Sequence, residues 1–215
     1  VKNGNTYWET SRGYSCVEFG VKNTMSTRFT VASVTKQLTA FAIMLLHDKG
    51  MLALNVDANT YLPTDIQFPS GITVHDLLAH TSGLYNFYNF EDDFYIGADR
   101  LPYDRKAFVH DWILKQPMKA PGKSFNYNNS NYNLLAWIIE NIAKQPYTDF
   151  LRENIFLPLG MVNTEFDDGM AVLENKANNY MHDYEKLVRV PYVNNLFLMG
   201  AGALVTNCDD LQKWY

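Results

Sequence analysis

The 215-residue sequence has only two cysteines, Cys16 and Cys208, and no long apolar run. Two cysteines are too few for a disulfide scaffold, and they show no metal-ligand spacing. We expect two small packed residues or near-surface thiols, with a single disulfide as the alternative. The most apolar stretch, residues 38–46, is much shorter than the roughly 18–20 residues that cross a bilayer. The sequence therefore predicts no membrane span in this chain.

Basic residues are also few: the chain has 18 Lys and Arg, fewer than its 23 Asp and Glu, and they form no basic run. This balance disfavours nucleic acid or an acidic membrane as the main partner. The five histidines lack His-Glu-x-x-His or any other ligand spacing, so we expect neither a metal nor a cofactor. The absence of Gly-x-Ser-x-Gly argues against an α/β-hydrolase. Gly200-Ala201-Gly202 lacks the third glycine of a dinucleotide loop, since Val205 stands there.

The beginning of the chain has the composition of a strand. Asn3-Gly4 is a hairpin turn signal, and residues 6–19 are rich in β-branched and aromatic side chains. A natural start inside a hairpin would be unusual, so we expect further residues before Val1, among them any export signal.

Residues 29–32 form an extended lead-in to a helix that begins at Ser33. This helix is apolar nearly all round, which predicts burial on every side. Lys49-Gly50 gives it a favourable end, with a cation in the last turn and a glycine after it. Thr73 can cap a short helix, and further helical patterns follow at residues 108–113, 134–139 and 147–151, the last ending near Pro158.

Ser33-Val34-Thr35-Lys36 places a base beside a nucleophile, because residues i and i+3 share one face of a helix. Serine needs a neighbouring base to take its proton. Lysine can be that base once burial and the positive end of a helix lower its pKa towards neutrality. The same backbone N–H groups can hold an oxyanion.

The alternative for Ser33 and Lys36 is a helix cap followed by a surface lysine, since Ser-x-x-Lys arises by chance about once in a chain of this size. Two features oppose it. A capping box prefers Glu or Gln at the position of Lys36, and a lysine in the first turn opposes the helix dipole. The helix is also otherwise apolar, so we expect Lys36 to be away from a solvated face.

Tyr127-Asn128-Asn129 lies between the Pro121-Gly122 turn and the next helix. A tyrosine hydroxyl near a lysine can pass a proton to a leaving group, and an amide can hold both lysine and substrate. Tyr-x-Asn is a weak pattern that recurs at Tyr192-Val193-Asn194, and an ordinary loop tyrosine is the alternative. We prefer Tyr127 because a tight turn leading into a helix makes a fixed platform.

Four ordered segments resemble the serine β-lactamase and penicillin-binding protein superfamily, most closely the branch of class C β-lactamases, related esterases and D-amino-acid peptidases. The first is Thr27-Arg28-Phe29 leading into Ser33-Val34-Thr35-Lys36-Gln37, and the second is Leu77-Leu78-Ala79-His80-Thr81-Ser82-Gly83-Leu84. The third is Phe125-Asn126-Tyr127-Asn128-Asn129-Ser130-Asn131-Tyr132, and the fourth is Gly200-Ala201-Gly202-Ala203-Leu204-Val205 followed by Asp210-Leu211. The resemblance implies that Ser33 is acylated, that Lys36 is the general base and Tyr127 the proton shuttle, and that Asn129 touches Lys36 and the substrate amide. The Ser33 N–H would form half of the oxyanion hole.

The third motif of that family, Lys-Thr-Gly or His-x-Gly on a late edge strand, has no match in a plausible place. We therefore expect the natural protein to continue past Tyr215, so that this chain is truncated at both ends. His80 belongs to the loop motif, where it either contacts substrate or is a hydrogen-bonded structural residue. Residues 85–93, with aromatic side chains followed by acidic ones, either line a substrate cleft or pack a helical insertion.

The resemblance predicts an α+β fold of the β-lactamase/transpeptidase kind, an antiparallel sheet flanked by helices plus a helical insertion. We expect residues 1–58 to form part of the α/β domain and residues 59–215 a mainly helical domain. The predicted function is a serine hydrolase for an ester, amide or β-lactam, outside the cytoplasm by resemblance. The alternatives are a penicillin-binding sensor that is acylated without turnover and an inactive interaction scaffold.

Overall fold

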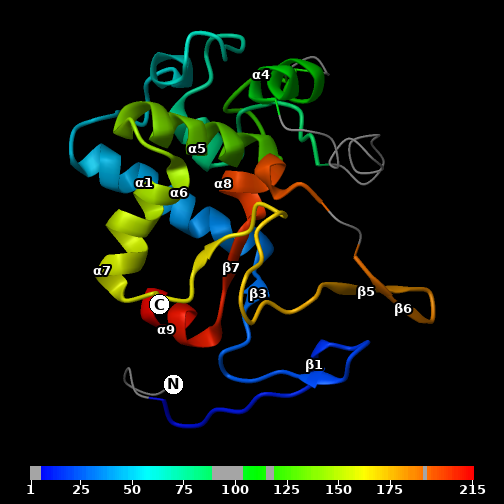
Figure 1. Ribbon diagram of the computed structural model, residues 1–215. Helices are drawn as coiled ribbons and strands as arrows, with labels where there is room; N and C mark the ends of the chain where they lie inside the picture. Colours follow the sequence, from blue (N-terminus) through cyan, green and yellow to red (C-terminus); the bar gives the residue numbers. More distant parts are fainter. Residues whose placement is uncertain (1–5, 89–103, 115–118, 191–192) are drawn as a thin grey trace.

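The computed structural model describes residues 6–88, 104–114, 119–190 and 193–215. Helices fill the upper part of Figure 1, and short strands lie below them. The helices are α1 (Thr35–Asp48), α2 (Val74–Leu78), α4 (Arg105–Phe108), α5 (Asn129–Ala143), α6 (Tyr147–Leu151), α7 (Leu157–Leu159), α8 (Met199–Gly202) and α9 (Cys208–Trp214). Short 3-10 turns cover Ala32–Val34, Ala58–Tyr61 and Asn195–Leu198, and π-helical turns cover Val109–Ile113 and Arg152–Phe156.

Among the described residues, strands form three small antiparallel sheets. The central one has the order β3 (Phe29–Thr30), β7 (Leu204–Thr206) and β4 (Glu165–Phe166), with Phe29 opposite Thr206 and Glu165 opposite Val205. The others pair β1 (Tyr14–Cys16) with β2 (Val21–Lys22) and β5 (Tyr180–Asp183) with β6 (Lys186–Arg189). The predicted α+β fold with antiparallel sheets and a block of helices is confirmed. The central sheet joins strands from both sides of residue 58, and the domain division there stays a prediction.

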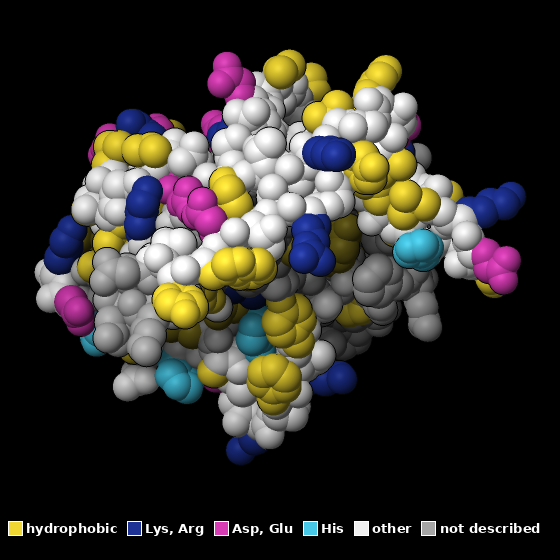
Figure 2. Space-filling model, turned by 90° about the horizontal axis from the view of Figure 1, so that it is seen from below, with side chains coloured by type: hydrophobic (Ala, Val, Ile, Leu, Met, Phe, Trp, Pro, Cys, Tyr) yellow, Lys and Arg dark blue, Asp and Glu magenta, His cyan; other side chains and the backbone are white. Residues whose placement is uncertain are grey.

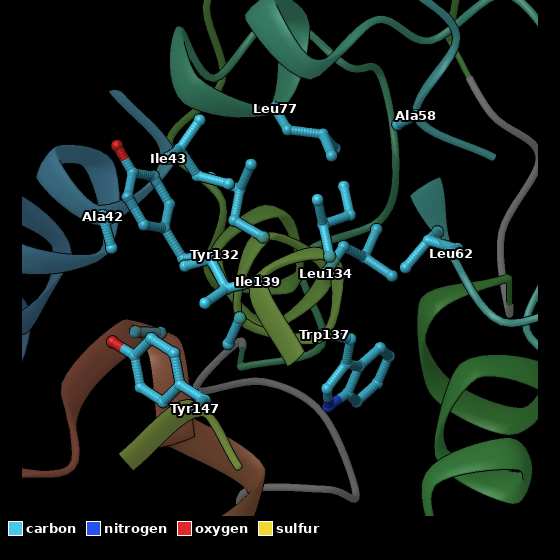
Figure 3. Packing of buried hydrophobic residues seen from close by; sticks show 14 of the residues in the cluster. Ala42, Ile43, Ala58, Leu62, Leu77, Tyr132, Leu134, Trp137, Ile139 and Tyr147 are labelled. Carbon is cyan, nitrogen blue, oxygen red and sulfur yellow. The ribbon is translucent and has the colours of Figure 1, made fainter. Parts of the chain in front are cut away.

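Helix α5 is the centre of the hydrophobic core. Every residue from 130 to 139 is buried, because this helix is covered on all sides. Figure 3 shows Leu134 and Ile139 of α5 among side chains from other elements, including Ile43 of α1 and Leu77 of α2. A fully buried Leu or Ile contributes about 1.5–3 kcal/mol of transfer free energy, so this packing holds α5 in place, with Asn129 as its first residue.

Helix α1 differs from its predicted burial. Leu38, Ile43 and Leu46 are in the core, but Phe41 and Met44 are exposed by 42% and 38%, so the prediction of burial on every side is wrong. The outward face of α1 contacts α9, because the Phe41 ring lies edge-on to the Trp214 ring with centroids 5.2 Å apart. Apolar composition alone does not say what covers a helix face. The predicted helix end is confirmed, since α1 stops at Asp48.

The N-terminal strand is much shorter than predicted. Of residues 6–19, only 14–16 form a strand, because their partner β2 has just two residues. Residues 6–13 follow the surface without regular structure, and Thr6 Oγ1 donates to Gln212 Oε1 of α9 at 3.5 Å. Figure 2 shows exposed apolar side chains on the face seen from below, where Figure 1 places this segment and β1. The predicted Asn3-Gly4 turn lies outside the described residues.

Candidate active site

Ser33 lies in a constrained turn between β3 and α1. Ala32 has a φ of +44°, an unusual conformation for a residue with a Cβ. Two hydrogen bonds hold it, because Thr35 Oγ1 donates to the Ala32 carbonyl at 2.7 Å and Leu204 N donates to Thr35 Oγ1 at 3.2 Å. Ser33 itself lies in the 3-10 turn that precedes α1, where it caps neither helix with its side chain. The buried strand β7 thus fixes the position of Ser33.

Lys36 is only 6% exposed, as the apolar helix predicted. Its Nζ lies 2.7 Å from the Ala201 carbonyl, 2.8 Å from Asn129 Oδ1 and 3.2 Å from Ser33 Oγ. Burial lowers the pKa of Lys36 to about 7. A neutral amine has two hydrogens and one lone pair. With the hydrogens on Ala201 and Asn129, the lone pair is left for the Ser33 hydroxyl.

Tyr127 is the second side chain in contact with Ser33 Oγ. Its hydroxyl donates to Ser33 Oγ at 2.6 Å, and its ring centroid lies 4.9 Å from Lys36 Nζ. Ser33 Oγ is therefore in contact with both an amine and a phenol, which are the groups required to remove and return a proton. The competing pattern at Tyr192 lies partly outside the described residues.

Asn129 is the first residue of α5, and the preceding Asn128 caps that helix by accepting from Ser130 N. Asn129 donates to one acceptor twice, from its backbone N at 3.0 Å and from Nδ2 at 3.3 Å, both to Asn86 Oδ1. This contact leaves Asn129 Oδ1 facing Lys36, so Asn86 fixes the orientation of the amide. The sequence included Asn86 among residues 85–93 but did not predict this contact.

Four of the residues singled out in the sequence, Ser33, Lys36, Tyr127 and Asn129, come together at one point. His80 is next to this cluster and is only 9% exposed. It stacks on Tyr127 with ring centroids 4.6 Å apart. The Ala201 carbonyl was not predicted, because a backbone oxygen has no side-chain signature.

Ser33 opens into a cleft of about 1260 Å³. Asn86 and Tyr88 line it, whereas Phe87 is fully buried in the core. This segment therefore contributes both to the cleft and to the core. The remainder of the predicted segment, residues 89–93, lies outside the described part. The lining of the cleft is mixed. Its polar part includes Asp167, Lys176, Asn178, Asn179, Arg189 and Asn195, and its apolar part includes Leu173, Val190, Val193 and Leu198.

Metal-binding groups, disulfides and membrane-spanning helices are absent from the part of the chain that the structure describes. Its His, Cys, Asp and Glu side chains form no group of three that could hold a metal ion. Cys16 and Cys208 are both unpaired. No helix in the described ranges is long and apolar enough to span a bilayer.

Comparisons with known proteins identify relatives of this chain. A family profile described as Beta-lactamase matches residues 1–215. Protein flp of Staphylococcus aureus is 32% identical over 222 residues, which cover 100% of this chain and 43% of that protein. The octameric penicillin-binding protein homologue from Pyrococcus abyssi is 29% identical with a TM-score of 0.81, over 100% of this chain and 50% of that one.

The D-amino acid amidase from Ochrobactrum anthropi SV3, solved with L-phenylalanine amide, has a TM-score of 0.75 and 26% identity. The match covers 94% of this chain and 58% of the amidase. The chain thus spans about half the length of the proteins it resembles.

Proposed function

The chain belongs to the β-lactamase family, and from that premise we propose that it is a serine hydrolase that acylates Ser33 with an ester, amide or β-lactam. One observation carries the proposal: Ser33 Oγ lies 3.2 Å from Lys36 Nζ and accepts a 2.6 Å hydrogen bond from the Tyr127 hydroxyl. This arrangement places a base and a proton donor each within hydrogen-bond reach of the nucleophile.

In the acylation step, neutral Lys36 takes the Ser33 proton while Oγ attacks the substrate carbonyl carbon. The carbonyl π electrons move to oxygen, and the backbone N–H of Ser33 stabilises that oxyanion, as the family resemblance implies. When the carbonyl re-forms, the bond to the leaving group breaks. Tyr127 donates its proton to the departing atom and regains one from Lys36. The products are a Ser33 ester and the protonated leaving group.

Deacylation repeats the sequence with water as the nucleophile. Lys36 accepts a proton from water, the hydroxide oxygen bonds to the acyl carbon, and Ser33 leaves as an alcohol after receiving a proton through Tyr127. Asn129 holds Lys36 through its Oδ1 in both halves of the cycle. Its amide also contacts the substrate, again by the family resemblance.

The substrates to test first are small amides and esters. The amidase relative supports amides of D-amino acids, and the penicillin-binding homologue supports β-lactam acylation. The asparagine side chains that line the cleft suit a peptide-like substrate, because they can both donate to and accept from amide groups.

The experiment combines intact-mass measurement with turnover. The protein is incubated with a fluorescent penicillin, with D-phenylalanine amide and with p-nitrophenyl butyrate. We expect label or turnover that Ser33→Ala abolishes and that the exposed Ser26→Ala retains. Repeated turnover identifies a hydrolase, whereas stable one-to-one labelling identifies the sensor alternative. Equal signals from wild type and Ser33→Ala would exclude the mechanism.

A further inference from the structure

His80 has an unusual backbone for a buried side chain. Its φ is +60°, in the left-handed region that histidine and asparagine enter more readily than most residues. It follows α2, and its imidazole faces inward rather than toward the cleft lining. A strained conformation of this kind persists when surrounding contacts hold it.

The contacts of His80 enclose Tyr127. Asn126 N donates to the His80 carbonyl at 2.8 Å, and Asn128 N donates to His80 Nδ1 at 3.0 Å. The backbone is therefore held on both sides of Tyr127 by one residue. The His80 ring also makes tilted contacts with the rings of Tyr127 and Tyr132, with centroids 4.6 Å and 5.1 Å away.

We propose that His80 is a positioning residue for Tyr127, which it clamps by two backbone hydrogen bonds and one ring contact so that the phenol stays on Ser33 Oγ. The inference rests on the proposed function, because it explains how the proton shuttle is aimed. It assigns to His80 a role distinct from contacting the substrate. A shift of about 1 Å in a catalytic group can cost on the order of 100-fold in rate, so a clamp of this kind matters.

The clamp needs a neutral imidazole. Nδ1 must accept from Asn128 N, so the ring proton is on Nε2. Burial, followed by the charge of Lys36, lowers the pKa of His80 to about 4. Besides Lys36, the titratable groups facing the ring are the phenols of Tyr127 and Tyr132. His80 therefore remains neutral throughout the range in which Lys36 titrates.

Two variants separate the parts of the clamp. His80→Asn keeps an acceptor and tolerates the left-handed backbone, whereas His80→Phe keeps the ring and loses the acceptor. We expect His80→Phe to lower kcat for p-nitrophenyl butyrate by about 10- to 100-fold with KM little changed. His80→Asn should stay within a few fold of wild type. The control His75→Phe, at an exposed position on the adjoining helix α2, should leave kcat unchanged.

Melting temperatures of the same variants separate positioning from loss of structure. A kcat of His80→Phe equal to that of wild type would overturn the proposal. So would equal falls in kcat in His80→Phe and His80→Asn that parallel their falls in melting temperature. A readout independent of catalysis uses ¹⁵N NMR of the wild-type protein. We expect an Nε2–H tautomer at pH 6 and a coupling between Asn128 N–H and His80 Nδ1. A protonated His80 at that pH refutes the clamp even if Ser33 proves to be acylated, and Ser33→Ala tests acylation separately.

Discussion

Acylation of Ser33 should depend on pH through Lys36. Burial lowers the Lys36 pKa from 10.5 to about 7. About half of these amines are then neutral at pH 7, whereas at the ordinary pKa only about one in three thousand would be. Because only the neutral amine can accept the Ser33 proton, we expect the rate to rise about tenfold from pH 6 to pH 8 and to level off above that.

Lys36→Arg removes the base while it keeps the positive charge, because the guanidinium stays protonated in proteins. The expected loss is about 10²–10⁴ in acylation rate, the usual contribution of a positioned base. The assay is single-turnover reaction with p-nitrophenyl butyrate from pH 5 to 9, followed at the isosbestic wavelength of p-nitrophenol. Lys49→Arg, an exposed lysine at the end of α1, is the matched control.

The same pKa shift predicts how stability responds to pH. The folded pKa lies below the unfolded one, so between about pH 7 and 10.5 the unfolded chain binds a proton that native Lys36 has released. This contribution to the free energy of unfolding is full above pH 10.5 and is lost as pH falls through 7. Urea unfolding should show that slope in wild type and not in Lys36→Met. A pH-independent acylation rate from 5 to 9, or a Lys36→Arg protein as fast as wild type, refutes the reasoning.

Three further changes test the surroundings of Ser33. Tyr127→Phe removes the proton donor and should lower kcat by about 10²–10⁴ with little change in melting temperature; a wild-type kcat would remove Tyr127 from the mechanism. Asn86→Ala frees the Asn129 amide and should cost about 1–3 kcal/mol of stability, because the Asn129 N and Nδ2 donors lose their shared acceptor; urea unfolding measures the loss, and kcat should fall. Gly200→Ala should cost about 1–3 kcal/mol or more, because its Cβ would lie 2.1 Å from the Tyr132 carbonyl. The control Gly202→Ala makes only ordinary contacts, and equal stability of the two variants would contradict the packing argument.

The local patterns in the sequence predicted most of the catalytic cluster. Ser33 and Lys36 are three residues apart on one helical turn, and Tyr127 and Asn129 flank the residue that caps α5. Short-range geometry suggested each pair, and the ordered family segments selected these pairs over chance patterns. The cap at Thr73 was equally local, and its side chain accepts from Asp76 N as expected.

Contacts between distant segments could not be predicted in this way. Asn86 reaches Asn129 across 43 residues, and nothing in a loop asparagine indicates its partner. The exposure of Phe41 depends on what lies over α1, which an apolar pattern does not contain. The strand around Tyr14 is short because pairing requires a partner of matching length, and β propensity alone does not provide one.

The contacts of Lys36 have a consequence for the timing of folding. Its amine contacts Asn129 and Ala201, which lie 93 and 165 positions further along the chain. Contacts of such sequence separation form late, because long loops must close first. Until then the amine is hydrated and charged, and Ser33 is an unreactive alcohol. If Ser33 is acylated as proposed, reactivity towards an acyl donor marks the arrival of the native state, and the folding chain carries no activated serine.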